Sequence, residues 1–280
     1  MNSGLSHKAV TADFAAADDV LAAAEMGALA ELGSLRLTPS GRIGPIVEIL
    51  MAKRDWASAM TNVQIAIPFA DPLDRAMNQQ QISGTGYRSR SGAFPLARLC
   101  EDGQDTTEWE LWCSRAEQAA VASSFPKPLA SAIIGAMIEF QDNVHLHSGR
   151  PGTGVVAYGS SRTHFEIVVA DAGIGVLASL RQNHEHAGLT NAGSALKVAI
   201  RDGASRLGSS GGYGFGMGQM FRALANHDGE LRFRSDDYAL IVRGHSPSLS
   251  GSIELRHKAG LRGLIVSVRC PAPHESLADL

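Results

Sequence analysis

A carboxylate and an amide, Glu139 and Asn143, are four residues apart in a segment with helical hydrophobic spacing. In a helix this separation brings both side chains to one face, one turn apart. A carboxylate can orient or deprotonate a nucleophile, and an amide oxygen is a suitable ligand for Mg²⁺. Because most Glu/Asn pairs at this spacing are simply solvated, the pair indicates a site only together with other motifs.

A second motif, Asp171-x-Gly173-x-Gly175, follows an apolar segment that is typical of a strand. A carboxylate at a strand end can accept a hydrogen bond from an exocyclic amine such as N6 of adenine. Glycines, which have no Cβ, allow the backbone to approach a flat base closely. Taken alone, the motif is more typical of an ordinary Asp/Gly turn.

Glycine then recurs at alternate positions, just before a segment with helical spacing: Gly212, Gly214, Gly216 and Gly218. Such a loop leaves successive backbone N–H groups free to face an anion, and the helix N-terminus adds partial positive charge. The pattern therefore predicts phosphate binding, with a flexible loop as the alternative. The chain has no G-x-x-x-x-G-K-[ST] motif, and this cluster is neither G-x-G-x-x-G nor directly preceded by a strand, so P-loop and Rossmann-type sites are unsupported.

In order and spacing, these three motifs resemble the N, G1 and G2 boxes of the GHKL ATPase superfamily, which includes gyrase-type, histidine-kinase-type and MutL-type ATP-binding domains. The resemblance covers residues 123–271, with 263–269 in the place of the family's last strand. It implies an α/β fold of the Bergerat type, a two-layer sandwich with helices on one face of a mixed sheet. It also implies a mobile lid over ATP at 176–211.

The resemblance implies roles for single residues as well. Asn143 would coordinate Mg²⁺, and Asp171 would recognise adenine. Glu139 occupies the position of a general base in gyrase-like members and in anti-sigma-factor serine kinases, and 143–148 resembles the latter branch. The base and phosphates would be framed by glycines: Gly173, Gly175, Gly212, Gly214, Gly216 and Gly218.

The leading hypothesis is thus a Mg·ATP-binding regulatory protein with slow ATP hydrolysis or phosphoryl transfer, either an ATPase or a protein kinase. Two alternatives stay open: an anti-sigma-like switch that binds a protein partner when loaded with nucleotide, and a module that binds ATP without catalysis. We expect a regulatory protein partner and leave a homodimer open. His7 is the only histidine before residue 140, and it lacks the following proline expected of a phospho-acceptor.

Other polar residues have simpler interpretations. The histidines of the two central segments have no common zinc spacing, so we expect them to be solvated or packed: His145, His147, His184 and His186. The arginines of the C-terminal strands are expected to alternate toward solvent: Arg232, Arg234, Arg256 and Arg269.

Hydrophobic periodicity predicts the elements that position these motifs. Helices are expected near 18–33, capped by Asp18 or Asp19, and at 43–54, 107–122, 126–147 and 194–202. Strands are expected at 62–70, 154–158, 164–170, 230–235, 238–243, 252–256 and 263–269, with a loop or linker at 76–96.

Length and composition bound the remaining possibilities. The chain has 280 residues, 44% hydrophobic and 19% charged, which is typical of a globular protein. A net charge of −3 gives no support for nucleic-acid binding, and no run approaches the ~18 apolar residues of a membrane span. With no signal-peptide pattern and three cysteines in no metal-ligand spacing, we expect a cytoplasmic protein. We divide it into a smaller α/β or mostly helical sensing or partner-binding region at 1–122, an ATP-binding domain at 123–273 and a tail at 274–280.

Overall fold

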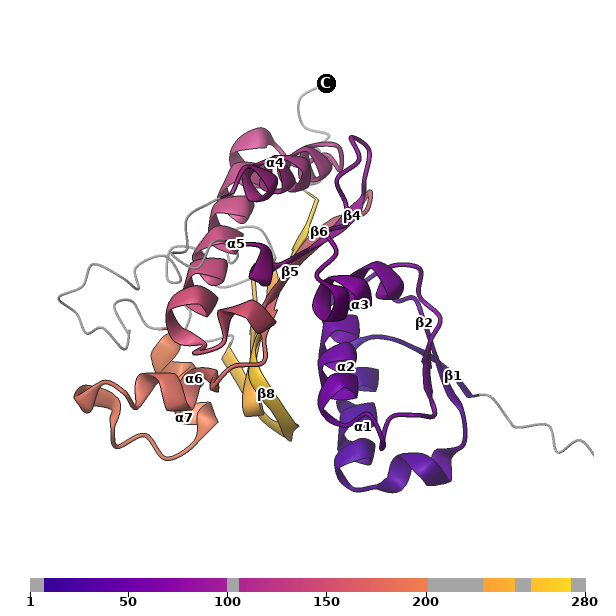
Figure 1. Ribbon diagram of the computed structural model, residues 1–280, viewed down its shortest axis with the longest axis vertical. Coiled ribbons are helices and arrows are strands. Elements are labelled where there is room, and N and C mark those ends of the chain that lie inside the picture. The colour runs from indigo at the N-terminus through magenta and orange to yellow at the C-terminus, as the bar shows by residue number, and fades with distance from the viewer. Residues whose placement is uncertain (1–7, 100–105, 201–228, 245–252, 273–280) are drawn as a thin grey trace, which may run out of the picture.

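The computed structural model describes residues 8–99, 106–200, 229–244 and 253–272 and shows an α/β protein with two sheets (Figure 1). The N-terminal sheet is parallel, in the order β1 (Lys8–Thr11), β2 (Leu35–Thr38) and β3 (Val63–Ile65). The second sheet has the order β4 (Ser91–Pro95), β5 (Val155–Ser160), β6 (His164–Asp171), β8 (Ile253–Pro271) and β7 (Glu230–Arg243). All of its described strands pair antiparallel, so the expectation of a mixed sheet is wrong.

Helices alternate with the strands of the N-terminal sheet: α1 (Phe14–Glu25), α2 (Gly44–Asp55) and α3 (Ala70–Gln79). We call residues 8–79 the N-terminal layer. The cap of α1 is Asp13, whose Oδ1 accepts a hydrogen bond from the backbone N–H of Ala16 at 2.8 Å. Asp18, expected as a cap, therefore lies inside the helix. The segment expected as a loop at 76–96 begins with the end of α3 and contains β4.

Four further helices belong to the larger sheet: α4 (Thr107–Val121), α5 (Lys127–His147), α6 (Gly175–Leu180) and α7 (Ala192–Ala199). Short 3-10 helices occur at Ala28–Leu32, Leu96–Arg98, Pro151–Thr153 and His184–His186. No helix in the described parts of the chain is long and apolar enough to cross a membrane.

Helices cover both faces of the larger sheet, rather than the one face that we expected. Along β6, Phe165, Ile167 and Val169 join the core formed with α4–α7. Val168 and Ala170, which alternate with them, join the core formed with the N-terminal layer. Figure 1 accordingly shows α1–α3 between the two sheets and α4–α7 on the far side of the larger one.

Aromatic side chains pack α4 against β4 and β5 of this sheet. The ring of Phe94 on β4 lies 5.0 Å from that of Trp109, which stacks on Trp112 at 5.6 Å, and Trp112 meets Tyr158 of β5 at 5.2 Å. Both tryptophans are buried, so they serve the core. The sheet and its core therefore extend across the boundary that we expected between residues 122 and 123.

The last two strands are long and irregular. The four strands expected after residue 229 fall within β7 and β8. The two ends of β7 meet, since the N–H of Gly244 donates a hydrogen bond to the carbonyl of Gly229 at 2.7 Å, so β7 reverses direction at the break expected between 235 and 238. The pairing register shifts between Ser235 and Tyr238, where Asp236 has a left-handed backbone with φ of 51°. On β8, Gly263 has φ of 84°. Both strands therefore deform at the same end of the sheet.

Buried ion pairs connect the N-terminal layer to β7. The side chains of Arg232 and Arg234 are only 3% and 1% exposed. Glu48 of α2 and Asp18 of α1 form ion pairs with both arginines. The expectation that Arg232 and Arg234 face solvent is therefore wrong, because the N-terminal layer covers that face of the sheet.

A further buried carboxylate, Glu166 of β6, accepts hydrogen bonds from the backbone N–H groups of Ile43 at 3.0 Å and Gly44 at 2.9 Å. These groups lie at the N-terminus of α2, where a negative charge is favoured. Glu166 thus fixes this end of α2 to the sheet.

Candidate functional site

The helix α5 carries the first predicted pair. It buries Ile133, Met137 and Val144 against the sheet and leaves Glu139 exposed, with Asn143 half-buried one turn later. The Nδ2 of Asn143 donates a hydrogen bond to the backbone oxygen of Glu139 at 2.8 Å. This bond fixes the amide, and its Oδ1 has no hydrogen-bond partner among the described residues. The oxygen that could bind a metal is thus available.

Asp171, the last residue of β6, is buried with 1% of its surface exposed. Its Oδ1 accepts a hydrogen bond from the backbone N–H of Gly173 at 2.7 Å, whereas Oδ2 has no such partner within the described ranges. Burial raises the pKa of the carboxyl to about 6, and the hydrogen bond from Gly173 opposes that rise. The site therefore holds a buried carboxyl with one open acceptor.

The turn after Asp171 lies against the end of α5. The backbone N–H of Ile174 donates to the carbonyl of Ser148 at 2.8 Å. A Cβ added to Gly173 would lie 2.1 Å from that same carbonyl oxygen, so this position needs glycine for the contact with α5. Gly175 needs glycine for its backbone, with φ of 74°. The structure thus brings the end of α5 and the Asp171 turn together.

On its other side, the turn is held by β7. The Oγ of Ser235 accepts a hydrogen bond from the N–H of Val176 at 3.0 Å and donates one to the carbonyl of Gly263 at 2.8 Å. A Cβ on Gly175 would lie 2.9 Å from this Oγ and 3.1 Å from Oδ2 of Asp236. Sequence reasoning missed Ser235, whose only signal is the interruption of alternating hydrophobicity at 235–237.

The predicted phosphate loop, with Gly212, Gly214, Gly216 and Gly218, lies outside the described residues. So does the expected lid from 201 onward. The described part, 176–200, holds both α6 and α7 where we expected one helix. A Cβ on Gly193 of α7 would lie 2.8 Å from the ring of Tyr238, so α7 packs closely on β7.

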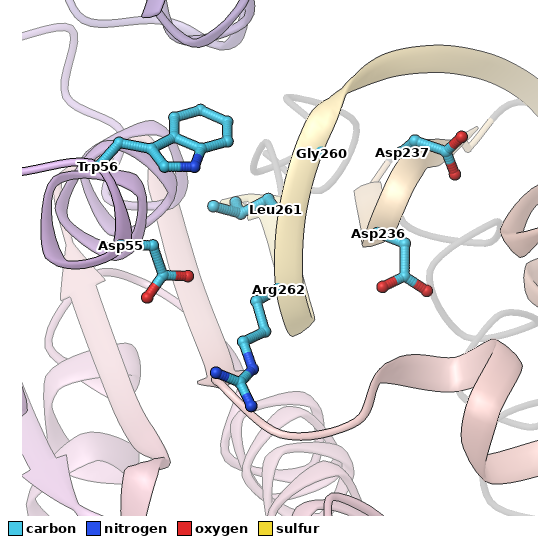
Figure 2. A pocket seen from close by; sticks show the side chains of 7 residues that line it. All are labelled: Asp55, Trp56, Asp236, Asp237, Gly260, Leu261 and Arg262. Atoms are coloured by element: carbon cyan, nitrogen blue, oxygen red, sulfur yellow. The ribbon is translucent and has the colours of Figure 1, made fainter. Parts of the chain in front are cut away.

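A shallow cavity of about 380 Å³ lies where the end of α2 meets β7 and β8, and it shares Asp236 with the surroundings of the turn (Figure 2). It is lined by Asp55, Trp56, Asp236, Asp237, Gly260, Leu261 and Arg262. Figure 2 shows Asp55 on one side of β8 and Asp236 and Asp237 on the other, so the three carboxylates do not converge. Nor does any group of three His, Cys, Asp or Glu side chains in the described parts of the chain form a metal cluster. We therefore place the candidate site at α5 and the Asp171 turn.

We compared the chain with family models, with curated proteins and with solved structures, and none of them matched. The interpretation of the site therefore rests on its own residues and geometry.

Replacing Asp171 with Asn should stabilise the protein at neutral pH. The raised pKa means that the native state holds this proton more tightly than the unfolded chain, so wild type loses stability as pH rises from about 4 through 6. The pKa of Asp171 differs by about two pH units between the folded and the unfolded chain, which corresponds to about 3 kcal/mol of stability that wild type loses at high pH. Asp171→Asn has no ionisable group at this position and does not lose this stability. Urea unfolding of both proteins at pH 4 and pH 7.5 measures the effect.

The control is Asp19→Asn on the exposed side of α1, which removes a surface carboxylate. If the stability difference between Asp171→Asn and wild type were the same at both pH values, Asp171 would not be a buried ionisable group.

Proposed function

We propose that the α5 side of the larger sheet binds Mg·ATP in the manner of the GHKL ATPases, on a Bergerat-type fold. The observation that carries this proposal is Asp171, a buried carboxyl at a strand end, with one oxygen held by Gly173 and the other without a hydrogen-bond partner among the residues that the structure describes. Burying a carboxyl without hydrogen bonds to both of its oxygens costs free energy. A ligand that donates a hydrogen bond to the second oxygen would offset part of that cost. A donor such as the N6 amine of adenine suits the open oxygen.

The architecture supports the same proposal. An antiparallel sheet carries α4–α7 on one face, and α5 ends directly beside the Asp171 turn through the contact between Ser148 and Ile174. The segment that follows the N box is therefore in contact with the G1 turn, which supports a shared site. In this proposal the N-terminal layer is an addition on the opposite face.

The residues of α5 fit a hard metal ion. Asn143 offers an amide oxygen, and Glu139 offers a carboxylate one turn earlier. Magnesium bound at Asn143 would neutralise phosphate charge. Glu139 is exposed, so its carboxylate is accessible to accept a proton from water or from a substrate hydroxyl. The glycines of 212–218 are proposed to contact the phosphates.

The activity that we propose is slow ATP hydrolysis or phosphoryl transfer, with a regulatory role. Labelled ATP distinguishes the outcomes. Released phosphate supports an ATPase, label on a serine of a partner protein supports a kinase, and acid-labile label on this chain supports a histidine kinase. Nucleotide binding with none of these supports a switch or a non-catalytic module.

Asn143→Ala should abolish the magnesium dependence of ATP binding. The side chain is half-buried beside a helix core formed by other residues, so the fold should persist while the metal loses its ligand. We expect ATP affinity with magnesium to fall by about 10- to 100-fold or more, to the level found without magnesium. Calorimetric titration with and without the metal measures this.

The matched control is Asp142→Asn, on the exposed side of the same helix, which should bind as wild type does. If Asn143→Ala kept wild-type affinity in the presence of magnesium, Asn143 would not be a metal ligand.

A further inference from the structure

Consecutive side chains of β7 reach opposite layers of the molecule. Leu231 and Phe233 join the core with α4–α7, whereas Arg232 and Arg234, which alternate with them, reach the N-terminal layer. The next residue, Ser235, returns to the first face and contacts α6. One strand therefore touches both the N-terminal layer and the candidate site within two residues.

The N-terminal side of this connection is a buried cluster of charges. Glu48 Oε1 lies 2.6 Å from Nε of Arg232, and Glu48 Oε2 lies 2.6 Å from Nη1 of Arg234. Asp18 Oδ1 lies 2.6 Å from Arg232 and 3.2 Å from Arg234, and Lys258 pairs with the same carboxylate at 2.6 Å. Because buried charges without partners are costly, α1 and α2 define where this part of β7 can lie.

On the face of the sheet that carries the candidate site, the connection consists of one hydroxyl group, that of Ser235. Ser235 is fully buried, and its Oγ accepts a hydrogen bond from the backbone N–H of Val176, one of the first residues of α6. The N–H groups at the start of a helix have no partner within the helix, and the residue before α6 provides no side-chain cap. Ser235 therefore supplies the cap from another strand and fixes the turn at Gly175.

We propose that the N-terminal layer regulates the nucleotide site through β7, with Ser235 as the positioning residue that joins the ion-pair cluster of Asp18, Glu48, Arg232 and Arg234 to the Gly175 turn. This inference rests on the proposed function of that turn. A partner that shifts α1 and α2 would move Arg234. Because Ser235 is the next residue, its hydrogen bond with the N–H of Val176 at the start of α6 would then break or form. Since coupling between sites is reciprocal, bound nucleotide would in turn tighten the N-terminal layer on the sheet.

The first test is Ser235→Ala. The substitution removes the hydrogen bonds of Oγ to Val176 and to Gly263, and the loss of the first should raise the hydrogen-exchange rate of the Val176 amide by about tenfold. Affinity for the non-hydrolysable analogue AMPPNP with magnesium should fall by about 5- to 30-fold. The control is Ser123→Ala, another buried serine, which lies just after α4 and whose hydroxyl donates a hydrogen bond to the carbonyl of Ala119. It should leave both quantities within twofold of wild type.

The second test is Asp18→Asn, which weakens the cluster without touching the site. We expect faster exchange at Val176 and analogue affinity reduced by about two- to fivefold. The control is Glu230→Gln, which removes another ion pair between the N-terminal layer and β7, that with Arg42, at the far end of the strand. It should change neither quantity.

These outcomes separate the two proposals. If wild type binds no nucleotide, the proposed function fails, and the exchange rates alone show whether the N-terminal layer controls the Gly175 turn. If wild type binds the analogue but Ser235→Ala and Asp18→Asn bind it equally well with unchanged exchange at Val176, regulation through β7 is overturned while the proposed function stands.

Discussion

Replacing Glu48 with alanine is expected to lower the free energy of unfolding by about 3–5 kcal/mol at pH 7. Glu48 is fully buried and makes three hydrogen bonds to Arg232 and Arg234, which are themselves buried. In Glu48→Ala, Asp18 alone would face the two guanidinium groups in a medium of low dielectric constant. Urea unfolding followed by circular dichroism measures the loss.

The control for this prediction is Glu108→Ala, which breaks the exposed pair between Arg98 and Glu108, whose side chains are 46% and 51% exposed. Solvent screens such a pair, so its removal should change stability by less than about 1 kcal/mol. Equal, small losses in both variants would show that the arginines of β7 are solvated and that the N-terminal layer does not seal this face.

Local patterns predicted most elements of the larger sheet and its helices. The helical stripe of α5 and the apolar run of β6 were sufficient to place Glu139, Asn143 and Asp171 on the right elements, because each signal lies within one segment. The break expected within β7 coincides with the reversal between Ser235 and Tyr238, which brings Gly229 and Gly244 together. Gly263 has a positive φ where β8 passes the end of β6, and a Cβ there would lie 2.0 Å from the carbonyl oxygen of Asp171.

The second face of the sheet could not be predicted in this way. The alternation of Leu231, Arg232, Phe233 and Arg234 shows that one face is polar, but it does not show what covers that face. The covering carboxylates are 184 residues away for Glu48 with Arg232 and 216 for Asp18 with Arg234. Polar residues on a strand are therefore compatible with both solvent and a charged, buried interface.

The candidate site was predictable only in part for a related reason. The spacing of Asp171, Gly173 and Gly175 indicates a tight turn, yet the contacts that make it a defined site come from distant segments. Gly173 is required by the carbonyl of Ser148, and Val176 is capped by Ser235, which is 59 residues further along the chain. Such supporting contacts leave no fixed spacing in the sequence.

Glu139→Gln is expected to separate nucleotide binding from chemistry. The substitution keeps the size of the side chain but removes the carboxylate that would accept a proton from water or from a hydroxyl. Asn143 remains one turn away, with its amide fixed by the backbone oxygen of residue 139, which the substitution retains. Mg·ATP should therefore bind within a few-fold of wild type, while turnover falls by ~10²–10⁴, the usual contribution of a positioned general base.

Binding and turnover must be measured on the same preparation, with Glu110→Gln as the control because Glu110 is an exposed glutamate of α4. The exposed position of Glu139 makes a structural loss small, since its side chain is not part of the helix core. If Glu139 only orients water around magnesium, turnover should fall less and affinity should fall with it. If Glu139→Gln retains wild-type turnover, Glu139 is not the base, and a non-catalytic nucleotide-gated switch becomes the better interpretation of the site.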